Sequence, residues 1–129
     1  MTRGLLDTSV LIAIDEAGSR EIPDSSGISV ISLGELRAGV ILARDETSRS
    51  LRENRLAFVR RTFELLPVDG HVAHHFGEAL AWARSKRRLS KGSDLLIIAT
   101  AAAGDLELVT LDSTQAAIAR GVGVSVVNP

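Results

Sequence analysis

Four carboxylates occupy positions from which they could share a cation. They are Asp7, Glu35, Asp94 and Asp112. Asp7 and Asp112 each close a short apolar run of strand type, Glu35 lies near the start of a helical segment that follows a second such run, and Asp94 opens an apolar helix. Because parallel strands place ligands at their carboxyl ends, we expect the four side chains to meet at one edge of a sheet.

Such a cluster predicts a particular chemistry. Like charges a few ångströms apart raise one another's pKa and destabilise a fold unless a cation intervenes. Oxygen ligands without His or Cys suit Mg²⁺ or Mn²⁺ rather than zinc. Cations held in this way activate a water molecule and stabilise the leaving oxygen of a phosphodiester. The pattern therefore favours metal-dependent hydrolysis at a phosphate.

Each acid also has a purely structural interpretation. Asp7 and Asp112 precede helices and could be N-caps. Glu35 and Ser32 have the spacing of a capping box, and either Asp94 or Ser93 could cap the apolar helix. Taken together, the convergence of four acids on one edge favours the metal site.

Short apolar runs alternate with longer segments of helical periodicity, which predicts parallel β-α-β units. We expect strands over residues 4–7, 28–31, 65–68, 106–111 and 122–127, and helices over 10–14, 33–43, 48–64, 69–87, 94–103 and 113–120. The stretch 18–27 is rich in turn residues and is expected to be a connection, and Pro67 limits the third strand to an edge or a strand end. The prediction is an α/β fold, a single-domain α/β/α sandwich over residues 1–129 with a mostly parallel central sheet.

Composition narrows the possibilities further. A length of 129 residues fits one domain, and a net charge of −1 provides no general attraction to nucleic acid. The absence of cysteine excludes disulfides, thiolate metal sites and a cysteine nucleophile, and it agrees with a cytoplasmic location. Asp7 and Asp15 interrupt the N-terminal apolar run, so neither a signal peptide nor a membrane span is expected.

Four motifs resemble those of one known family. The stretch LLDTSVLI at residues 5–12 resembles the opening strand of PIN-domain nucleases. SLGEL at 32–36, DLLIIATA at 94–101 and LVTLD at 108–112 resemble the family's other three acidic motifs, in the same order along nearly the whole chain. The compact length is most similar to VapC-like toxins of toxin–antitoxin pairs.

The resemblance implies a divalent-metal endoribonuclease that uses Mg²⁺ or Mn²⁺, cleaves RNA and is neutralised by a small antitoxin. It implies that Asp7, Glu35, Asp94 and Asp112 are catalytic metal ligands. It further implies that the hydroxyls of Ser9 and Thr110 orient carboxylates or water, although both could be ordinary turn and strand residues. A homodimer is expected because the family often dimerises. The chain departs from the family pattern after the fourth acid: Ser113-Thr114-Gln115-Ala116 stands there, where the family often carries an aromatic residue.

Other groups leave alternatives open. Arg84, Lys86, Arg87, Arg88 and Lys91 form a basic run just before Asp94. The run could bind RNA phosphates or could simply be a solvated helix end. His71 and His75 have helical ligand spacing, but surface histidines are the preferred interpretation. Helices 33–43 and 48–64 are expected to present an apolar groove to the antitoxin.

Two other functions remain as alternatives to the nuclease. One is a non-catalytic PIN-like module that binds RNA or protein, against which the complete set of four acids argues. The other is a small phosphatase, which would need a second Asp two positions after Asp7, where this chain has Ser9.

Overall fold

The computed structural model describes residues 3–14 and 25–129. Its elements, in chain order, are β1 (Arg3–Leu6), α1 (Thr8–Ile12), β2 (Ser25–Ser29), α2 (Val30–Ile41), α3 (Glu46–Thr62), β3 (Glu64–Leu66), α4 (Gly70–Ser85), α5 (Gly92–Gly104), β4 (Glu107–Val109), α6 (Ser113–Gly121) and β5 (Val126–Val127).

The described strands form one five-stranded sheet in the order β3-β2-β1-β4-β5. Every pairing in it is parallel, and β1 lies at the centre, with Leu5 beside Gly27 of β2 and Leu108 of β4. β3 ends at the residue before Pro67 and lies at the edge of the sheet, as predicted. The predicted parallel α/β architecture is confirmed.

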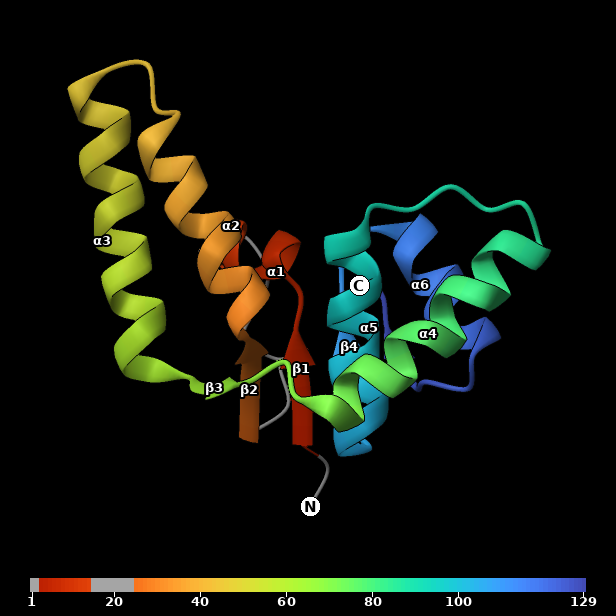
Figure 1. The fold of residues 1–129 in the computed structure, drawn as a ribbon. Helices are drawn as coiled ribbons and strands as arrows, with labels where there is room; N and C mark the ends of the chain where they lie inside the picture. The colour runs from red at the N-terminus through yellow and green to blue at the C-terminus, as the bar shows by residue number, and fades with distance from the viewer. Residues whose placement is uncertain (1–2, 15–24) are drawn as a thin grey trace.

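Alternating strand residues feed two separate hydrophobic cores. Leu5 and Leu108 face one cluster, which α4, α5 and α6 complete, whereas Leu6 and Val109 face a second cluster, which α1, α2 and α3 complete. Successive side chains of a strand point to opposite faces, so these two clusters mark the two sides of the sheet. Figure 1 shows the α2–α3 hairpin standing apart from α4, α5 and α6, with β1 and β2 between them. The layers are therefore α/β/α.

Helix ends follow the predicted signals in part. Asp69 caps α4 and accepts the backbone N–H of Val72 at 2.9 Å, as expected. α5 is buried, as its apolar sequence predicts, and Ile97 and Ile98 are fully covered. None of the helices within the described ranges is long and apolar enough to cross a membrane.

Several boundaries differ from the prediction. β2 covers 25–29 rather than 28–31, so the last three residues of the expected connection are strand; residues 15–24 lie outside the described part. The polar stretch Ser25–Gly27 is extended because β1 and β3 supply ladder partners on both sides. The last strand is only Val126–Val127, because residues 122–125 include a turn with Gly123 at φ 89°.

Candidate active site

Two of the four acids follow the central strands. Asp7 comes directly after β1, and its backbone N–H donates to the carbonyl of Val109 in β4 at 2.9 Å. Asp112 stands three residues after the end of β4. Both residues are also N-caps: Asp7 accepts the N–H of Ser9, and Asp112 accepts those of Thr114 and Gln115. The capping interpretation is thus confirmed for these two, and it accounts for only part of what their oxygens contact.

Glu35 and Asp94 are not caps. α2 begins at Val30 and is capped by the Ser29 hydroxyl, which accepts the N–H of Ile31 at 3.0 Å. The predicted capping box of Ser32 and Glu35 is therefore wrong, because both residues lie inside the helix. α5 starts after Lys91 without a side-chain cap, so neither Ser93 nor Asp94 caps it. A structural role at a helix end does not explain either acid.

Electrostatics shows that the four acids are neighbours. The pKa of Asp94 is raised from its ordinary value of 3.8 to about 6. Burial of its carboxyl is the largest cause, followed by the negative charges of Asp7, Asp112 and Glu35 in that order. The ammonium of Lys91 acts in the opposite direction. The fold has brought together acids that are up to 105 positions apart in the sequence (Asp7 and Asp112).

Asp7 is held by hydrogen bonds on both of its oxygens. Its Oδ2 accepts the Ser9 hydroxyl at 2.6 Å and the Ser9 N–H at 3.1 Å, and the Thr110 hydroxyl lies 3.2 Å away. Its Oδ1 accepts the side-chain amide of Gln115 at 3.2 Å. The carboxylate is only 4 % exposed. Its orientation is therefore fixed by neighbours on α1, on the segment after β4 and on α6.

Glu35 extends from α2 and contacts residues of α1 and α5. Its Oε1 accepts the Thr8 hydroxyl at 2.7 Å, and Ser93 on α5 lies 3.4 Å from its Oε2. The Thr8 oxygen is also 2.9 Å from the Ser32 hydroxyl. Since Thr8 has one hydroxyl proton, it donates to the carboxylate and accepts from Ser32. These contacts hold Glu35 between α1 and α5.

Two of these contacting residues were not predicted. Thr8 lies between the predicted site residues Asp7 and Ser9, but nothing in the local sequence indicated that its hydroxyl contacts an acid. Gln115 is 1 % exposed, lies 2.7 Å from the Thr110 hydroxyl through its Oε1 and donates to the carbonyl of Asp94 at 3.3 Å. It shares the apolar face of α6 with Ile118 and Ala119. A polar residue on an apolar stripe is the indication that could have identified it.

The donor set has the chemistry of a hard-cation site. The acids supply carboxylate oxygens alone, which suits Mg²⁺ or Mn²⁺. Within residues 3–14 and 25–129, however, no three His, Cys, Asp or Glu side chains already stand close enough to hold one ion. The cluster is thus a concentration of negative charge around the half-buried Asp94, not a finished coordination shell.

The basic run is spread along the connection between α4 and α5. Arg84 lies in the last turn of α4, Lys86 is its C-cap, and Arg87 has φ 53°. Arg88 lies 6.0 Å from the ring of Trp82. In Figure 1 this segment returns from the far end of α4 to the start of α5. Lys91 is the member whose charge acts on Asp94.

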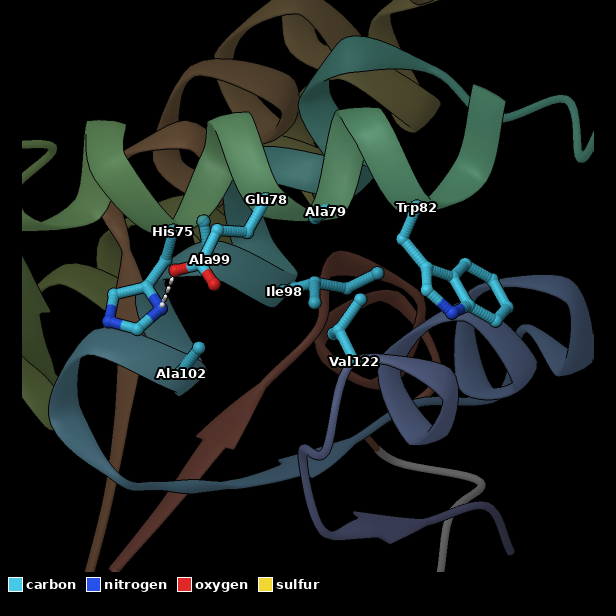
Figure 2. A pocket seen from close by; sticks show the side chains of 8 residues that line it. All are labelled: His75, Glu78, Ala79, Trp82, Ile98, Ala99, Ala102 and Val122. Atoms are coloured by element: carbon cyan, nitrogen blue, oxygen red, sulfur yellow. Dashed lines mark ion pairs between the residues drawn. The ribbon is translucent and has the colours of Figure 1, made fainter. Parts of the chain in front are cut away.

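A separate cavity of about 190 Å³ lies among α4, α5 and α6, and Figure 2 shows its lining. His75 Nδ1 faces Glu78 Oε1 at 3.4 Å at one end, and Trp82 stands at the other. None of the four clustered acids lines it. His71 and His74 are exposed and His75 is half-buried, so the preferred surface interpretation of the histidines holds for the first two.

Comparison with known proteins identifies the fold's family. The family model of the PIN domain matches residues 4–121. The chain belongs to the PIN domain family. This PIN domain is 40 % identical over 101 residues to Ribonuclease VapC8 of Mycobacterium tuberculosis, covering 76 % of this chain and 89 % of that protein. It is 33 % identical over 135 residues to Ribonuclease VapC5 of the same organism, covering 96 % and 93 %.

A solved structure resembles this PIN domain over its full length. The crystal structure of VapBC-5 from Mycobacterium tuberculosis, a member of the VapBC family of toxin–antitoxin systems, superposes with a TM-score of 0.91 at 32 % identity, covering 100 % of both chains. FitAcB from Neisseria gonorrhoeae superposes with a TM-score of 0.77 at 25 % identity, covering 97 % and 96 %. The relationship to VapC ribonucleases that the four acidic motifs predict is confirmed.

Proposed function

We propose that this PIN domain is a divalent-cation-dependent endoribonuclease and the toxin of a toxin–antitoxin pair. The observation that carries the proposal is the raised pKa of Asp94, which three other carboxylates at the same edge of a parallel sheet help to produce. Relatives at 33–40 % identity are named ribonucleases, and the match to Ribonuclease VapC5 covers 96 % of the chain, a share large enough to include all four acids. A cytoplasmic location follows from an RNA substrate.

Asp7, Glu35, Asp94 and Asp112 would hold Mg²⁺ or Mn²⁺. When bound, the cation supplies a water of lowered pKa and a counter-charge for the leaving oxygen of the phosphodiester. The side chains must draw inward to complete its coordination, since no ready ligand set exists among the described residues. Asp94 would be the acid most affected by binding, because it carries the repulsion of the other three.

The surrounding hydroxyls would set the direction of each carboxylate. Ser9 and Thr110 contact Oδ2 of Asp7, which leaves Oδ1 as the oxygen with fewer donors. Thr8 does the same for one oxygen of Glu35. Such outer contacts orient metal ligands and raise the affinity of a site.

The antitoxin would bind beside α3. A cavity of about 430 Å³ is lined by Ile14, Leu51, Asn54, Arg55 and Phe58, and Leu51 and Phe58 are exposed apolar side chains. An amphipathic helix or an extended peptide suits such a surface. The sequence suggested that Leu36, Val40 and Ile41 of α2 form this groove together with Leu51 and Phe58. Leu36 and Val40 are buried, whereas Ile41 is exposed.

Other partners remain proposals of the same kind. Lys91 stands beside Asp94 and would contact an RNA phosphate there. Contacts from Arg84, Lys86, Arg87 and Arg88, which are exposed, remain a prediction, and so does the homodimer.

The decisive experiment compares cleavage by the wild type and by Asp94→Asn. Purified wild type is expected to cut single-stranded or looped RNA in Mg²⁺ or Mn²⁺ and to stop in EDTA. The amide has the same shape but is a poor cation ligand, so the variant should be inactive while its circular dichroism is unchanged. Asp105→Asn is the matched control: Asp105 follows α5 at its other end, with φ 51°, and Asn tolerates that conformation. Cleavage by Asp94→Asn at the control's rate would overturn the proposal.

A further inference from the structure

A second cavity adjoins the acidic cluster and carries positive charge. It has a volume of about 250 Å³ and lies between α1, α2 and α3. Glu35 forms part of its wall, and Arg52 and Arg55 of α3 form another part. The remaining lining residues are Ile12, Leu36 and Gly39. Glu35 therefore belongs both to the wall of this cavity and to the acidic cluster described above.

The two arginines differ in how they are held. Arg52 donates from Nη1 to the carbonyl of Gly39 at 2.6 Å, so its guanidinium is tied across to α2. Arg55 is half-buried, and in the described ranges it has neither an ion-pair nor a hydrogen-bond partner. By contrast, Arg49 on the same helix pairs with Glu46 at 3.0 Å. A partly desolvated guanidinium without a partner is unfavourable until an anion reaches it.

We propose that Arg52 and Arg55 bind an RNA phosphate that neighbours the bond to be cut. The inference rests on the proposed ribonuclease function. Every nucleotide contributes one phosphate, so a strand lying over the carboxylates must place further phosphates on either side of them. The planar guanidinium matches two phosphate oxygens with two parallel N–H donors. The cavity of about 250 Å³ has room for a phosphate group, and the two guanidinium groups in its wall favour an anion there.

A polyanion explains this site better than an acidic peptide does. The cavity beyond Arg55 is lined mainly by Ile14, Leu51 and Phe58, which gives a peptide its apolar surface without the help of Arg52. Arg52 instead lines the cavity that includes Glu35, one of the four clustered carboxylates. Lys91 precedes α5, which covers one face of the sheet, whereas both arginines belong to α3, which covers the other face.

The test measures RNA binding separately from cleavage. All proteins carry Asp94→Asn so that the probe, a short labelled single-stranded RNA of mixed sequence, stays intact. Arg55→Gln is expected to weaken binding about tenfold, which corresponds to one charge-assisted hydrogen bond. It should also reduce the slope of log affinity against log salt by about 0.7, the value for one phosphate contact on a single strand. Arg55→Lys keeps the charge and should retain the slope while losing part of the affinity.

Arg60→Gln is the matched control, because Arg60 is an exposed arginine of α3 that does not line the cavity. Arg60→Gln should change both the RNA affinity and the salt slope much less than Arg55→Gln does. Equal affinities and slopes for Arg55→Gln and Arg60→Gln would overturn the site. Unchanged RNA binding together with lost binding of a hexaglutamate peptide would overturn it as well, in favour of an acidic protein partner. If Arg55→Gln fails to fold, Arg52→Gln and Arg55→Lys make the same comparison.

The two proposals fail in different ways. If RNA binding depends on Arg55 but the wild-type protein cuts no RNA with either cation, the ribonuclease proposal fails and the phosphate site stands. If the wild type cuts RNA and the salt slope ignores Arg55, the phosphate site fails and the ribonuclease proposal stands.

Discussion

The side-chain amide of Gln115 donates to Oδ1 of Asp7 at 3.2 Å, across 108 positions of sequence. The same side chain is close to the Thr110 hydroxyl and to the carbonyl of Asp94, so one neutral residue on α6 joins three segments that carry site residues. A neutral donor at this point fixes Asp7 without adding another charge to a crowded acidic cluster.

Gln115→Leu tests this connection. Leucine has a similar volume but leaves the Thr110 hydroxyl and the Asp94 carbonyl without their buried partner, which should cost about 1–3 kcal/mol in the free energy of unfolding. Cleavage should fall as well, because Asp7 loses its donor on Oδ1. Urea unfolding and an RNA cleavage assay measure the two effects. Thr114→Val, at an exposed neighbour whose backbone and not its side chain contacts Asp112, should change neither. Wild-type values for Gln115→Leu would show that the contact is incidental.

Glu35 can be tested through its response to a cation. The carboxamide of Glu35→Gln can still accept the Thr8 hydroxyl, so stability without metal should stay within about 1 kcal/mol of wild type. A cation that binds only the folded state stabilises it by about 2.7 kcal/mol at a hundredfold excess over its Kd. Urea curves with and without Mn²⁺ should show a smaller gain for Glu35→Gln than for wild type.

The matched control for that experiment is Glu78→Gln. Glu78 is exposed and faces His74 and His75, away from the acidic cluster. Its variant should gain as much from Mn²⁺ as the wild type does. Equal gains for all three proteins would remove Glu35 from the cation site.

Local pattern predicted the architecture because strand and helix periodicities are properties of neighbouring residues. The short apolar runs of β1 and β4 were visible in the sequence, and so were the acids that follow them. The structure shows that Leu5 and Leu6 enter different cores. The sequence did not show those strand boundaries that depend on tertiary partners. Ser25–Gly27 has the composition of a loop but forms strand between β1 and β3. A Cβ at Gly27 would come within 3.2 Å of the Glu64 carbonyl, so glycine relieves a tight contact where β3 approaches.

The sequence predicted the charged residues of the site but not the neutral residues that hydrogen-bond to them. The spacing of acids along the chain indicated an edge where they could meet, and the raised pKa of Asp94 agrees with that neighbourhood. Thr8 contacts Glu35 and Gln115 contacts Asp7. Each contact joins residues that are far apart in the sequence, so no local pattern predicts it. The capping box of Ser32 and Glu35 was wrong for a related reason. Ser29 and Ser32 are both possible caps by residue type, and the helix begins after Ser29, three residues earlier than the box requires.

Close packing at the far side of the molecule gives a prediction about the fold. A Cβ at Gly121, at the end of α6, would lie 2.1 Å from the Trp82 ring. Gly121→Ala must displace the indole, and overpacking of this kind costs about 1–3 kcal/mol. Gly77→Ala is the control: Gly77 lies within α4 with no atom near the added Cβ, so the change should stabilise by roughly 0.5–1 kcal/mol. Thermal unfolding of both variants should show shifts of opposite sign; equal shifts would contradict the contact.

The pH dependence of stability should report the raised pKa of Asp94, which burial of its carboxyl and then the neighbouring negative charges produce. Its pKa is about 6 in the folded protein and 3.8 when unperturbed, so between these values the folded state holds more of this proton than the unfolded state does. Stability therefore falls as the pH rises through this window and stays reduced above it. Asp94→Asn has no such proton.

Without divalent cations, the free energy of unfolding of the variant minus that of wild type should increase from about pH 4 to about pH 7. Added Mn²⁺ should narrow the difference at neutral pH, because a cation replaces the proton as the group that relieves the repulsion. Urea unfolding across this range measures it, with Asp105→Asn as the variant that should follow the wild type. A constant difference between Asp94→Asn and wild type at every pH would show that neither burial nor the other three acids change the pKa of Asp94 on folding.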